Sequence, residues 1–238
     1  MRLDVMSALD GIEPGLAEIA ALERRGIRVL NRPAALLAAH DKRQTALRLA
    51  EAGIPHPRTL HTTSLDEVRA LVPPFVLKPR FGSWGQDVVV CRDAGEVERS
   101  LATIGRRGWF RRHGLLVQDF VPPLGYDLRV VVAGDRVVGA GRREAAAGEW
   151  RTNVALGGRF ISAAPPAEAG ALAIDAARAI GADLVGVDLL PDPEHGYVVI
   201  EVNGAVDFND DEESLAGRNV YADTADALEI GQARLAAV

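Results

Sequence analysis

Apolar residues occur along this chain in short runs separated by glycine, proline and acidic residues, a pattern that is typical of strands joined by turns. Two such runs, residues 184–190 and 197–202, flank a polar turn at residues 191–196 and predict a β-hairpin. A second hairpin is predicted around Gly134 and Asp135. Its strands, and further strands elsewhere in the chain, are expected at residues 130–133, 136–140, 75–78, 87–91 and 115–120.

Helices are predicted where apolar residues recur every three or four positions, or where a capping residue opens a segment. Asp41, Ser64 and Asp93 each stand three residues before Gln or Glu, which is the signature of a capping box. The expected helices are residues 15–25, 41–52, 64–71, 93–104, a segment ending near 180, and 218–236. The apolar residues 27–30 predict a short strand, and the arginine-rich residues 105–113 predict a solvated loop.

The hairpin at residues 184–202 gathers oxygen-bearing side chains. If its turn is centred between Glu194 and His195, Asp188 lies opposite Glu201, and Asn203 points to the same side as Glu201. Two carboxylates facing each other across a strand pair repel, so a cation is expected between them. Oxygen ligands that include a carboxamide favour Mg²⁺ or Mn²⁺ over zinc. The alternative interpretation is that these side chains are only surface charge.

Composition narrows the choice of protein class. The 238 residues include 48% hydrophobic and 25% charged side chains, which is ordinary for a globular protein with a sizeable core. The net charge of -6 argues against a general nucleic-acid binder. The single cysteine, Cys91, fits a reducing compartment, and no apolar run is long enough to span a membrane. We therefore expect a cytoplasmic protein that binds neither nucleic acid nor membrane.

A lysine precedes a glycine-containing loop between two predicted strands. Lys78 ends the first strand, and Gly82, Ser83, Trp84 and Gly85 follow it. Glycines let a backbone approach a ligand closely, and successive N–H groups can face a phosphate. Taken alone, this pattern favours a plain hairpin turn beside a surface lysine, and it is not a P-loop.

The order of the motifs is more informative than any one of them. Asp-Lys, Leu-Lys-Pro with a glycine loop, Val-Gln-Asp-Phe, Asp-x-Arg, Gly-Glu-Trp-Arg-Thr-Asn, Gly-Val-Asp and Glu-Val-Asn follow one another between residues 30 and 205. This series resembles the ATP-grasp carboxylate–amine ligases of the RimK and LysX type, which include alpha-L-glutamate ligases. The resemblance implies an α+β ATP-grasp fold in which two α+β subdomains clasp ATP between antiparallel sheets.

The resemblance also implies a nucleotide site. Lys42 and Lys78 match the two lysines that reach the phosphates of ATP, and the glycine loop matches the mobile loop that covers them. Arg151, Thr152 and Asn153 match a nucleotide-side loop. Further matches are Gln118, Asp119 and Phe120 at the hinge that reads adenine, and Asp127 near the nucleotide sugar.

Asp188, Glu201 and Asn203 match the Mg²⁺ ligands of the family, in agreement with the hairpin geometry. Arg143, and less securely Arg142, matches an arginine near the transferred phosphate, and Arg129 matches a residue of the same face. The resemblance implies that Lys78, Arg129 and Arg143 are catalytic, with ATP and Mg²⁺ (or Mn²⁺) as cofactors. The implied reaction is ADP-forming: a carboxylate becomes an acyl phosphate, and an amine then displaces the phosphate.

The partners implied are a carboxylate, on a protein C-terminus, a carrier protein or a small acid, and an amino acid such as glutamate. The expected domains are residues 1–40, a remnant of an N-terminal domain; 41–120, a small subdomain with the glycine loop; and 121–238, a C-terminal subdomain with the metal site. Because the first segment is short for the family, two alternatives are open: either the chain is truncated, or a homo-oligomer or a partner chain completes the site. The alternative function is an ATP-binding module that stays inactive until such a partner is present.

Overall fold

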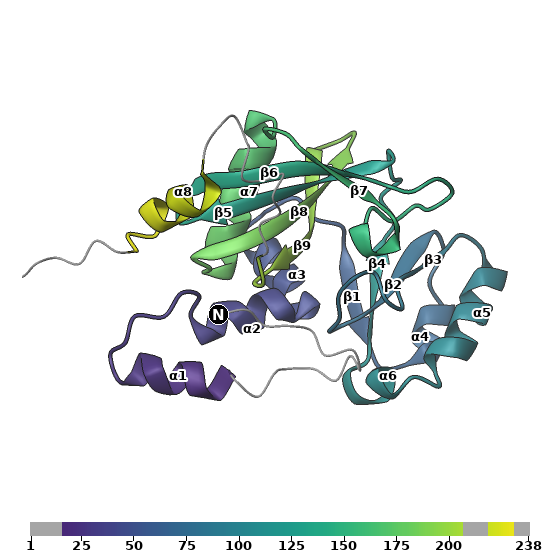
Figure 1. Ribbon diagram of the computed structural model, residues 1–238. Coiled ribbons are helices and arrows are strands. Elements are labelled where there is room, and N and C mark those ends of the chain that lie inside the picture. The colour runs from purple at the N-terminus through teal and green to yellow at the C-terminus, as the bar shows by residue number, and fades with distance from the viewer. Residues whose placement is uncertain (1–15, 207–218, 231–238) are drawn as a thin grey trace, which may run out of the picture.

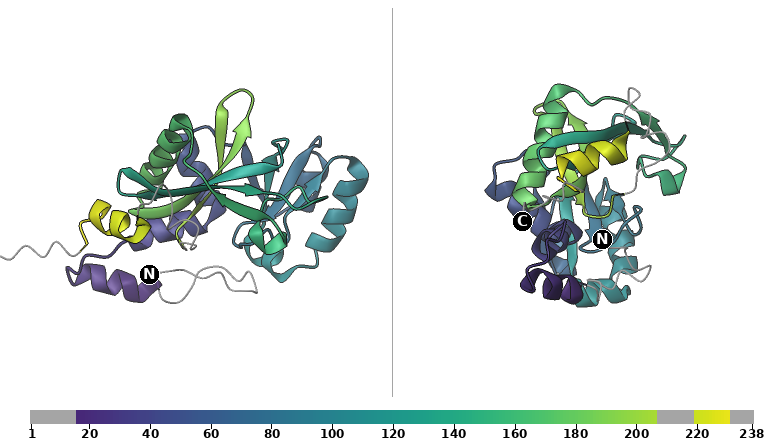
Figure 2. Two further views of the ribbon diagram at one scale, coloured as in Figure 1. Left: turned by 45° about the horizontal axis from the view of Figure 1, so that its top comes forward. Right: turned by 60° about the vertical axis from the view of Figure 1, so that its left-hand side comes forward.

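The computed structural model describes residues 16–206 and 219–230 and shows two lobes, each built on an antiparallel sheet (Figures 1 and 2). The small lobe has strand order β1-β4-β2-β3, and the large lobe has the order β7-β6-β5-β8-β9. The strands of the small lobe are β1 (Thr59–Thr62), β2 (Phe75–Pro79), β3 (Val89–Cys91) and β4 (Leu115–Asp119). Those of the large lobe are β5 (Tyr126–Ala133), β6 (Arg136–Glu144), β7 (Arg159–Ser162), β8 (Leu184–Asp192) and β9 (Gly196–Asn203).

Three helices pack on one face of the small sheet, namely α4 (Leu65–Arg69), α5 (Ala94–Ile104) and α6 (Gly108–His113). Ser64 and Asp93 cap α4 and α5 as their sequence signatures predict, each accepting a hydrogen bond from the backbone N–H of a glutamate. The prediction of a solvated loop at residues 105–113 is wrong for its second half. There Trp109 and Phe110 are buried in the core of this lobe, and the arginines stay on the outside.

The large sheet is covered on one face by α7 (Ala167–Ile180), whose alanines let the helix approach the strands closely. Because side chains alternate along a strand, the core against α7 takes every second residue, such as Val130 and Val132 on β5. The opposite face is divided. At one end of it Val131 and Ala133 pack against α8 (Val220–Ala227), and the other end faces the cleft between the lobes.

The N-terminal segment differs most from expectation. Helix α1 (Leu16–Arg24) is as predicted, but residues 27–30 form no strand, and Leu30 packs instead beside Val131 and Leu184. Helix α2 (Pro33–His40) was not predicted, because its residues are apolar on nearly every side and so lack a helical period. Asn31 joins this segment to β8: its carboxamide accepts from the backbone of Asp183 and Leu184 at 2.6 and 2.7 Å.

Helix α3 (Lys42–Glu51) begins at Asp41, whose side chain accepts from Arg43 N–H at 3.1 Å. It packs against α7 and β9, and the boundaries proposed for the domains stay a prediction. The expected C-terminal helix is α8, which ends at Ala227; residue 218 and residues 231–236 lie outside the described residues. Within the described ranges, no helix combines the length and the apolarity needed to cross a membrane.

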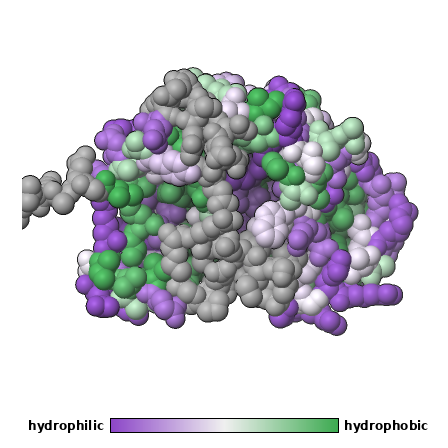
Figure 3. All heavy atoms as spheres, in the orientation of Figure 1, coloured by the Kyte–Doolittle hydropathy of each residue, from purple (hydrophilic) through white to green (hydrophobic). Residues whose placement is uncertain are grey.

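Figure 3 shows the front surface. Hydrophilic side chains cover the small-lobe side over α5, and hydrophobic ones gather on the opposite side over α1.

Candidate active site

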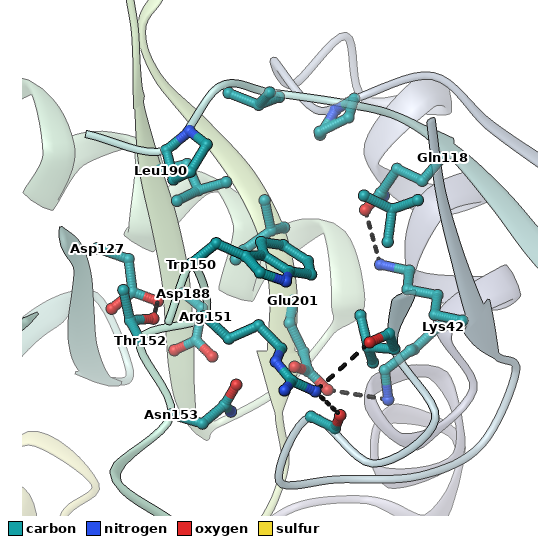
Figure 4. Close-up of a pocket in the computed structure, with 18 of the residues that line it drawn as sticks. Lys42, Gln118, Asp127, Trp150, Arg151, Thr152, Asn153, Asp188, Leu190 and Glu201 are labelled. Carbon is teal, nitrogen blue, oxygen red and sulfur yellow. Dashed lines mark hydrogen bonds and ion pairs between the residues drawn. The ribbon is translucent and has the colours of Figure 1, made fainter. Parts of the chain in front are cut away.

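A cleft between the two lobes brings most of the predicted site residues together (Figure 4). The small lobe and the start of α3 contribute the two lysines, the glycine loop and the β4 hinge, and the large lobe contributes the carboxylates, one arginine and the loop before β7. The predicted residues that line it are Lys42, Lys78, Gly82, Ser83, Gly85, Gln118, Asp119, Phe120, Asp127, Arg143, Arg151, Thr152, Asn153, Asp188 and Glu201. Arg129, Asn203 and Trp84 are predicted residues that do not line the cleft itself. Arg129 contacts the cleft residue Asp188, Asn203 lines an adjoining cavity, and Trp84 is half exposed.

Asp188 faces Glu201 across the β8–β9 pair, as the sequence predicts, but the pairs nearer the turn are shifted by one residue from the expected register. Near the turn the paired residue numbers sum to 388, as in Leu189 and Val199, whereas Asp188 and Glu201 sum to 389. A β-bulge at Ile200 makes the difference. Without the bulge Asp188 would pair with Ile200, so the bulge is what turns the Glu201 carboxylate into the cleft.

A second bulge acts in the same way in the β5–β6 hairpin. Close to the turn Val132 pairs with Val137, but one step further Val131 pairs with Gly139, which leaves Val138 as the extra residue. As a result Asp127 lies opposite Arg143 rather than Arg142. Arg142 instead stacks on the Tyr126 ring, with its guanidinium carbon 4.0 Å from the ring centroid. The bulge therefore decides which of the two arginines reaches the cleft.

The Asp188 carboxylate is buried among cationic and amide donors. Its Oδ2 accepts from Arg129 Nη2 at 3.1 Å and from Asn203 Nδ2 at 3.3 Å, and Arg143 Nη2 lies 3.0 Å away. Burial alone would raise the pKa of Asp188, but Arg129 and Arg143 outweigh it and hold that pKa below its usual value. Asp188 is thus an anion held by protein cations.

Arg143 joins two carboxylates. Its Nε donates to Asp127 Oδ1 at 2.8 Å, and its Nη2 lies between Asp127 and Asp188. Thr152 Oγ1 donates to Asp127 Oδ2 at 2.7 Å. Burial raises the pKa of Asp127, while the pKa of Arg143 is also raised, because the two carboxylates outweigh its burial. Both carboxylate oxygens of Asp127 therefore accept hydrogen bonds from within the protein, from Arg143 and Thr152.

Two lysines face the carboxylates from the other side of the cleft. Lys42, at the first turn of α3, places its Nζ 3.0 Å from Glu201 Oε1 and 2.5 Å from the carbonyl oxygen of Gly82. Lys78 Nζ donates to Gln118 Oε1 at 2.8 Å. Burial lowers the pKa of Lys78 to about 8, although Glu201 acts in the opposite direction.

Arg151 holds the glycine loop against the large lobe. Its Nη1 donates to the carbonyl oxygens of Gly85 at 2.9 Å and Val88 at 3.4 Å. Its Nε and Nη2 form a fork with the Glu149 carboxylate at 3.0 and 2.9 Å. Gly85 has a φ of +69°, and a Cβ there would lie 2.8 Å from Asn153 Oδ1, so both the backbone and the neighbouring loop favour glycine at this position. Arg151 thus binds the glycine loop with Nη1 and is itself held in place by Glu149.

The other end of the cleft is apolar and was missed by the sequence reasoning. Val76, Leu190 and Ile200 line it together with Trp150, whose ring meets Phe120 edge-on at 6.4 Å between centroids. The Val76 and Leu190 positions look like ordinary strand residues in the sequence, so nothing marked them. Trp150 belongs to the Gly-Glu-Trp-Arg-Thr-Asn motif, but the resemblance gives roles only to residues 151–153 of it.

A model of the RimK-like ATP-grasp domain matches residues 39–228 of the chain. The chain belongs to the RimK-like ATP-grasp family.

Relatives of this RimK-like chain agree with that assignment. It is 32% identical over 197 residues to the "Probable alpha-L-glutamate ligase" of Pseudomonas paraeruginosa, which covers 80% of this chain and 64% of that protein. The chain thus spans less than two thirds of the length of the curated relatives it matches first.

Solved structures show the same fold. The RimK domain ATP-grasp protein of Sphaerobacter thermophilus superposes with a TM-score of 0.67 at 26% identity, covering 91% of this chain and 76% of that one. The ATP-grasp ligase PsnB, solved with a precursor variant, Mg and ADP, gives a TM-score of 0.62 at 25% identity, covering 90% and 66%. The expected α+β ATP-grasp fold is confirmed.

The side chains of this RimK-like site fit a divalent cation. Within the described residues no group of three His, Cys, Asp or Glu side chains is placed to hold a metal ion, so a third protein ligand would have to be of another type, such as an amide oxygen. Asp188, Glu201 and Asn203 supply two carboxylates and one carboxamide at neighbouring positions of one hairpin. The Asp188 Oδ1 is buried and in contact with Arg129 Nε, so a metal ion bound there would share this oxygen with Arg129 or displace the guanidinium from it. This oxygen-only donor set suits Mg²⁺.

Lys78 should make the stability of the protein depend on pH. Because its folded pKa of about 8 lies below the unfolded value of 10.5, the unfolded chain binds more protons between these two pH values. The free energy of unfolding should rise with pH across this window, by about 3 kcal/mol from this group. Urea unfolding at intervals from pH 7 upward measures it, with Lys78→Met as the comparison. If the difference between wild type and variant is flat over this range, Lys78 is not buried as a destabilised cation.

Proposed function

We propose that this RimK-like ATP-grasp chain forms an amide bond between a carboxylate and the amine of an amino acid, using ATP and Mg²⁺ and releasing ADP. The observation that carries the proposal is the pairing of Asp188 with Glu201 at the floor of a cleft whose other wall holds Lys42 and Lys78. Carboxylates that bind Mg²⁺ beside lysines that bind phosphate are what phosphoryl transfer requires, because it depends on positioning and charge neutralisation.

The cleft separates the two ends of a nucleotide. The apolar end, lined by Val76, Leu190 and Trp150, suits a nucleobase, and the β4 hinge at Asp119 and Phe120 offers backbone groups along its edge. The opposite end has Lys42, Lys78 and the backbone of the glycine loop for the phosphates. Mg²⁺, when bound by Asp188, Glu201 and Asn203, would neutralise phosphate charge there.

The chemistry divides into two transfers. An oxygen of the substrate carboxylate attacks the γ-phosphorus, the bond from that phosphorus to ADP breaks, and an acyl phosphate forms. The amine nitrogen then attacks the acyl carbon, the carbon–oxygen bond to phosphate breaks, and the amine loses a proton. No nucleophile from the chain is needed. Arg143, kept charged by Asp127 and Asp188, would stabilise charge on the transferred group, and Arg129 would position Asp188.

Glutamate is the amine donor that we propose first, because the relatives at 32% identity are named as probable alpha-L-glutamate ligases. For the carboxylate we propose the C-terminus of a protein or peptide, since PsnB was solved with a precursor. The cytoplasm remains our expectation for where the reaction takes place.

The nucleotide product tests the mechanism. With ATP, Mg²⁺, radiolabelled glutamate and peptides ending in a free carboxylate, we expect equal amounts of ADP, phosphate and labelled amide, separated by chromatography. A reaction that releases AMP and pyrophosphate would contradict the acyl phosphate. ATP binding without ADP release under any acceptor would favour a binding module instead.

The metal site is tested by substitution. Asp188→Asn and Glu201→Gln should each lower the rate of ADP formation by about 100-fold or more, because the site loses ligand charge. Glu194→Gln, in the exposed turn of the same hairpin, is the matched control and should retain full activity. Circular dichroism confirms folding of each variant. Wild-type rates in either of the two site variants would show that these carboxylates hold no essential metal.

The Arg151 tether should control nucleotide release. Arg151→Ala removes both bonds to the glycine loop, so a fluorescent ATP analogue should dissociate about tenfold faster in stopped-flow measurements. Glu149→Gln weakens the fork and should act in the same direction but less. Arg159→Ala, which removes an exposed arginine paired with Glu144, serves as control. An unchanged dissociation rate in Arg151→Ala would mean that the tether does not hold the loop over the nucleotide.

A further inference from the structure

A second hollow lies between α3 and the edge of the small sheet. This α3–β1 groove has a volume of about 520 Å³, within the range of ligand-binding sites. Its walls come from one side of α3 and from the segment that leads into β1. The lining residues are Arg43, Ala46, Leu47, Ala50, His56, Arg58, Thr59, Leu60, His61 and Leu116. None of the residues named for the nucleotide site is among them.

One wall of the groove is a mostly apolar face of α3 that the described residues leave partly exposed. Arg43, Ala46, Leu47 and Ala50 recur at the spacing of a single helical face, and the buried side of α3 is formed by Thr45 and Leu49 instead. Leu47 is 45% exposed and Leu60, across the groove, is 44% exposed. The apolar surface of Leu47 and Leu60 is therefore accessible to a segment that docks between them.

The other wall includes residues 59–61 of β1, the edge strand of the small sheet, together with Leu116 of the neighbouring β4. β1 pairs with β4 on one side only, and within the described ranges residues 59–62 make no backbone-to-backbone hydrogen bond on the other side. An edge of this kind is a template on which an extended peptide can add as a further strand. β1 has four residues, so it would pair with a correspondingly short segment.

The positively charged side chains that line the groove favour a segment with negative charge. Every titratable side chain in it is an arginine or a histidine, in a chain whose net charge is -6. Arg43 is exposed and forms no ion pair with a described residue. Arg58 forms a two-pronged pair with Asp119, both contacts at 3.3 Å, but the two side chains are 85% and 54% exposed, so a second carboxylate can reach Arg58 from solvent. Both arginines therefore remain able to bind carboxylates.

We propose that the α3–β1 groove docks an acidic, extended segment of the protein substrate, which adds as a strand to β1. Its apolar side chains would cover the Ala46–Ala50 stripe of α3, and its carboxylates would reach Arg43 and Arg58. The proposal rests on the proposed function for the identity of its partner as a substrate. Because the groove lies apart from the nucleotide cleft, the docked segment is a recognition sequence, separate from the carboxylate that reacts.

The probe is a short fluorescein-labelled peptide of alternating glutamate and valine, with binding followed by fluorescence anisotropy without nucleotide. Saturable binding that weakens with added salt is expected. A peptide with lysine in place of glutamate should not bind. A glutamate–valine peptide N-methylated along the edge that faces β1 should lose at least about tenfold in affinity, because it cannot donate to the strand. Equal affinity of the N-methylated peptide would overturn strand addition.

Charge reversal locates the site. Arg43→Glu with Arg58→Glu should weaken peptide binding at least about tenfold, and so should Leu47→Asp. The matched control is Arg99→Glu with Arg106→Glu, two exposed arginines of the small lobe outside the groove, which should bind as wild type does. Equal loss in the control pair would mean nonspecific attraction. An oligonucleotide that displaces the peptide and outbinds it would overturn the choice of a peptide partner.

A melting shift with Mg²⁺–ATP, measured on every variant, separates the two proposals. Leu47→Asp should keep this shift while losing the peptide, because Leu47 lines the groove and not the nucleotide cleft, whereas Arg58 contacts Asp119 of the hinge. If the protein binds the peptide through the groove but shows no shift with Mg²⁺–ATP, the groove stands and the proposed ligase function fails. If the shift is present and the peptide does not bind, the groove proposal fails alone.

Discussion

The arrangement of the cleft depends on keeping the Asp188 carboxylate charged while it is buried. An isolated buried carboxylate is costly and would become protonated, so the protein surrounds it with Arg129, Arg143 and the Asn203 amide. Each of these comes from a different strand next to or near β8. The three strands β5, β6 and β9 must therefore lie in register with β8 for the site to exist at all.

The sheet achieves this with a row of opposite charges. Arg129 pairs with Asp188 across β5 and β8, and Asp127 pairs with Arg143 across β5 and β6. Asp127 and Arg129 are two residues apart, so both point to the cleft side of β5. Opposite charges facing each other across a strand pair are stabilising, whereas Asp188 and Glu201 are alike. Glu201 is the member of the row without an arginine, and Lys42 of α3 compensates it from the other wall.

The capping signatures, the glycine loop and the hairpins could be predicted from sequence because each depends on residues close together in the chain. The prediction that Asp188 lies opposite Glu201 is correct, but the turn centre assumed for it is half a residue too far along the chain. The bulge at Ile200 compensates for this difference. Neither Val138 nor Ile200 is a glycine, so no residue type marked the two bulges. Helix α2 and the apolar end of the cleft were missed because their patterns become distinct only when distant segments pack together.

The two bulges limit which changes in the length of the hairpin turns the site can tolerate. Each inserts one residue between a turn and a functional side chain, so the turn can be rebuilt without moving the site only while the bulge keeps its place. Beyond the bulge the β8–β9 pair must show Asp188 and Glu201 to the cleft while Val187 and Val202 pack under α7. A one-residue slip would exchange the two sets, burying carboxylates against α7 and exposing valines to the nucleotide. The hydrophobic core on one face of the sheet and the charged residues on the other therefore require the same register. A slip of the strands would disrupt both faces at once.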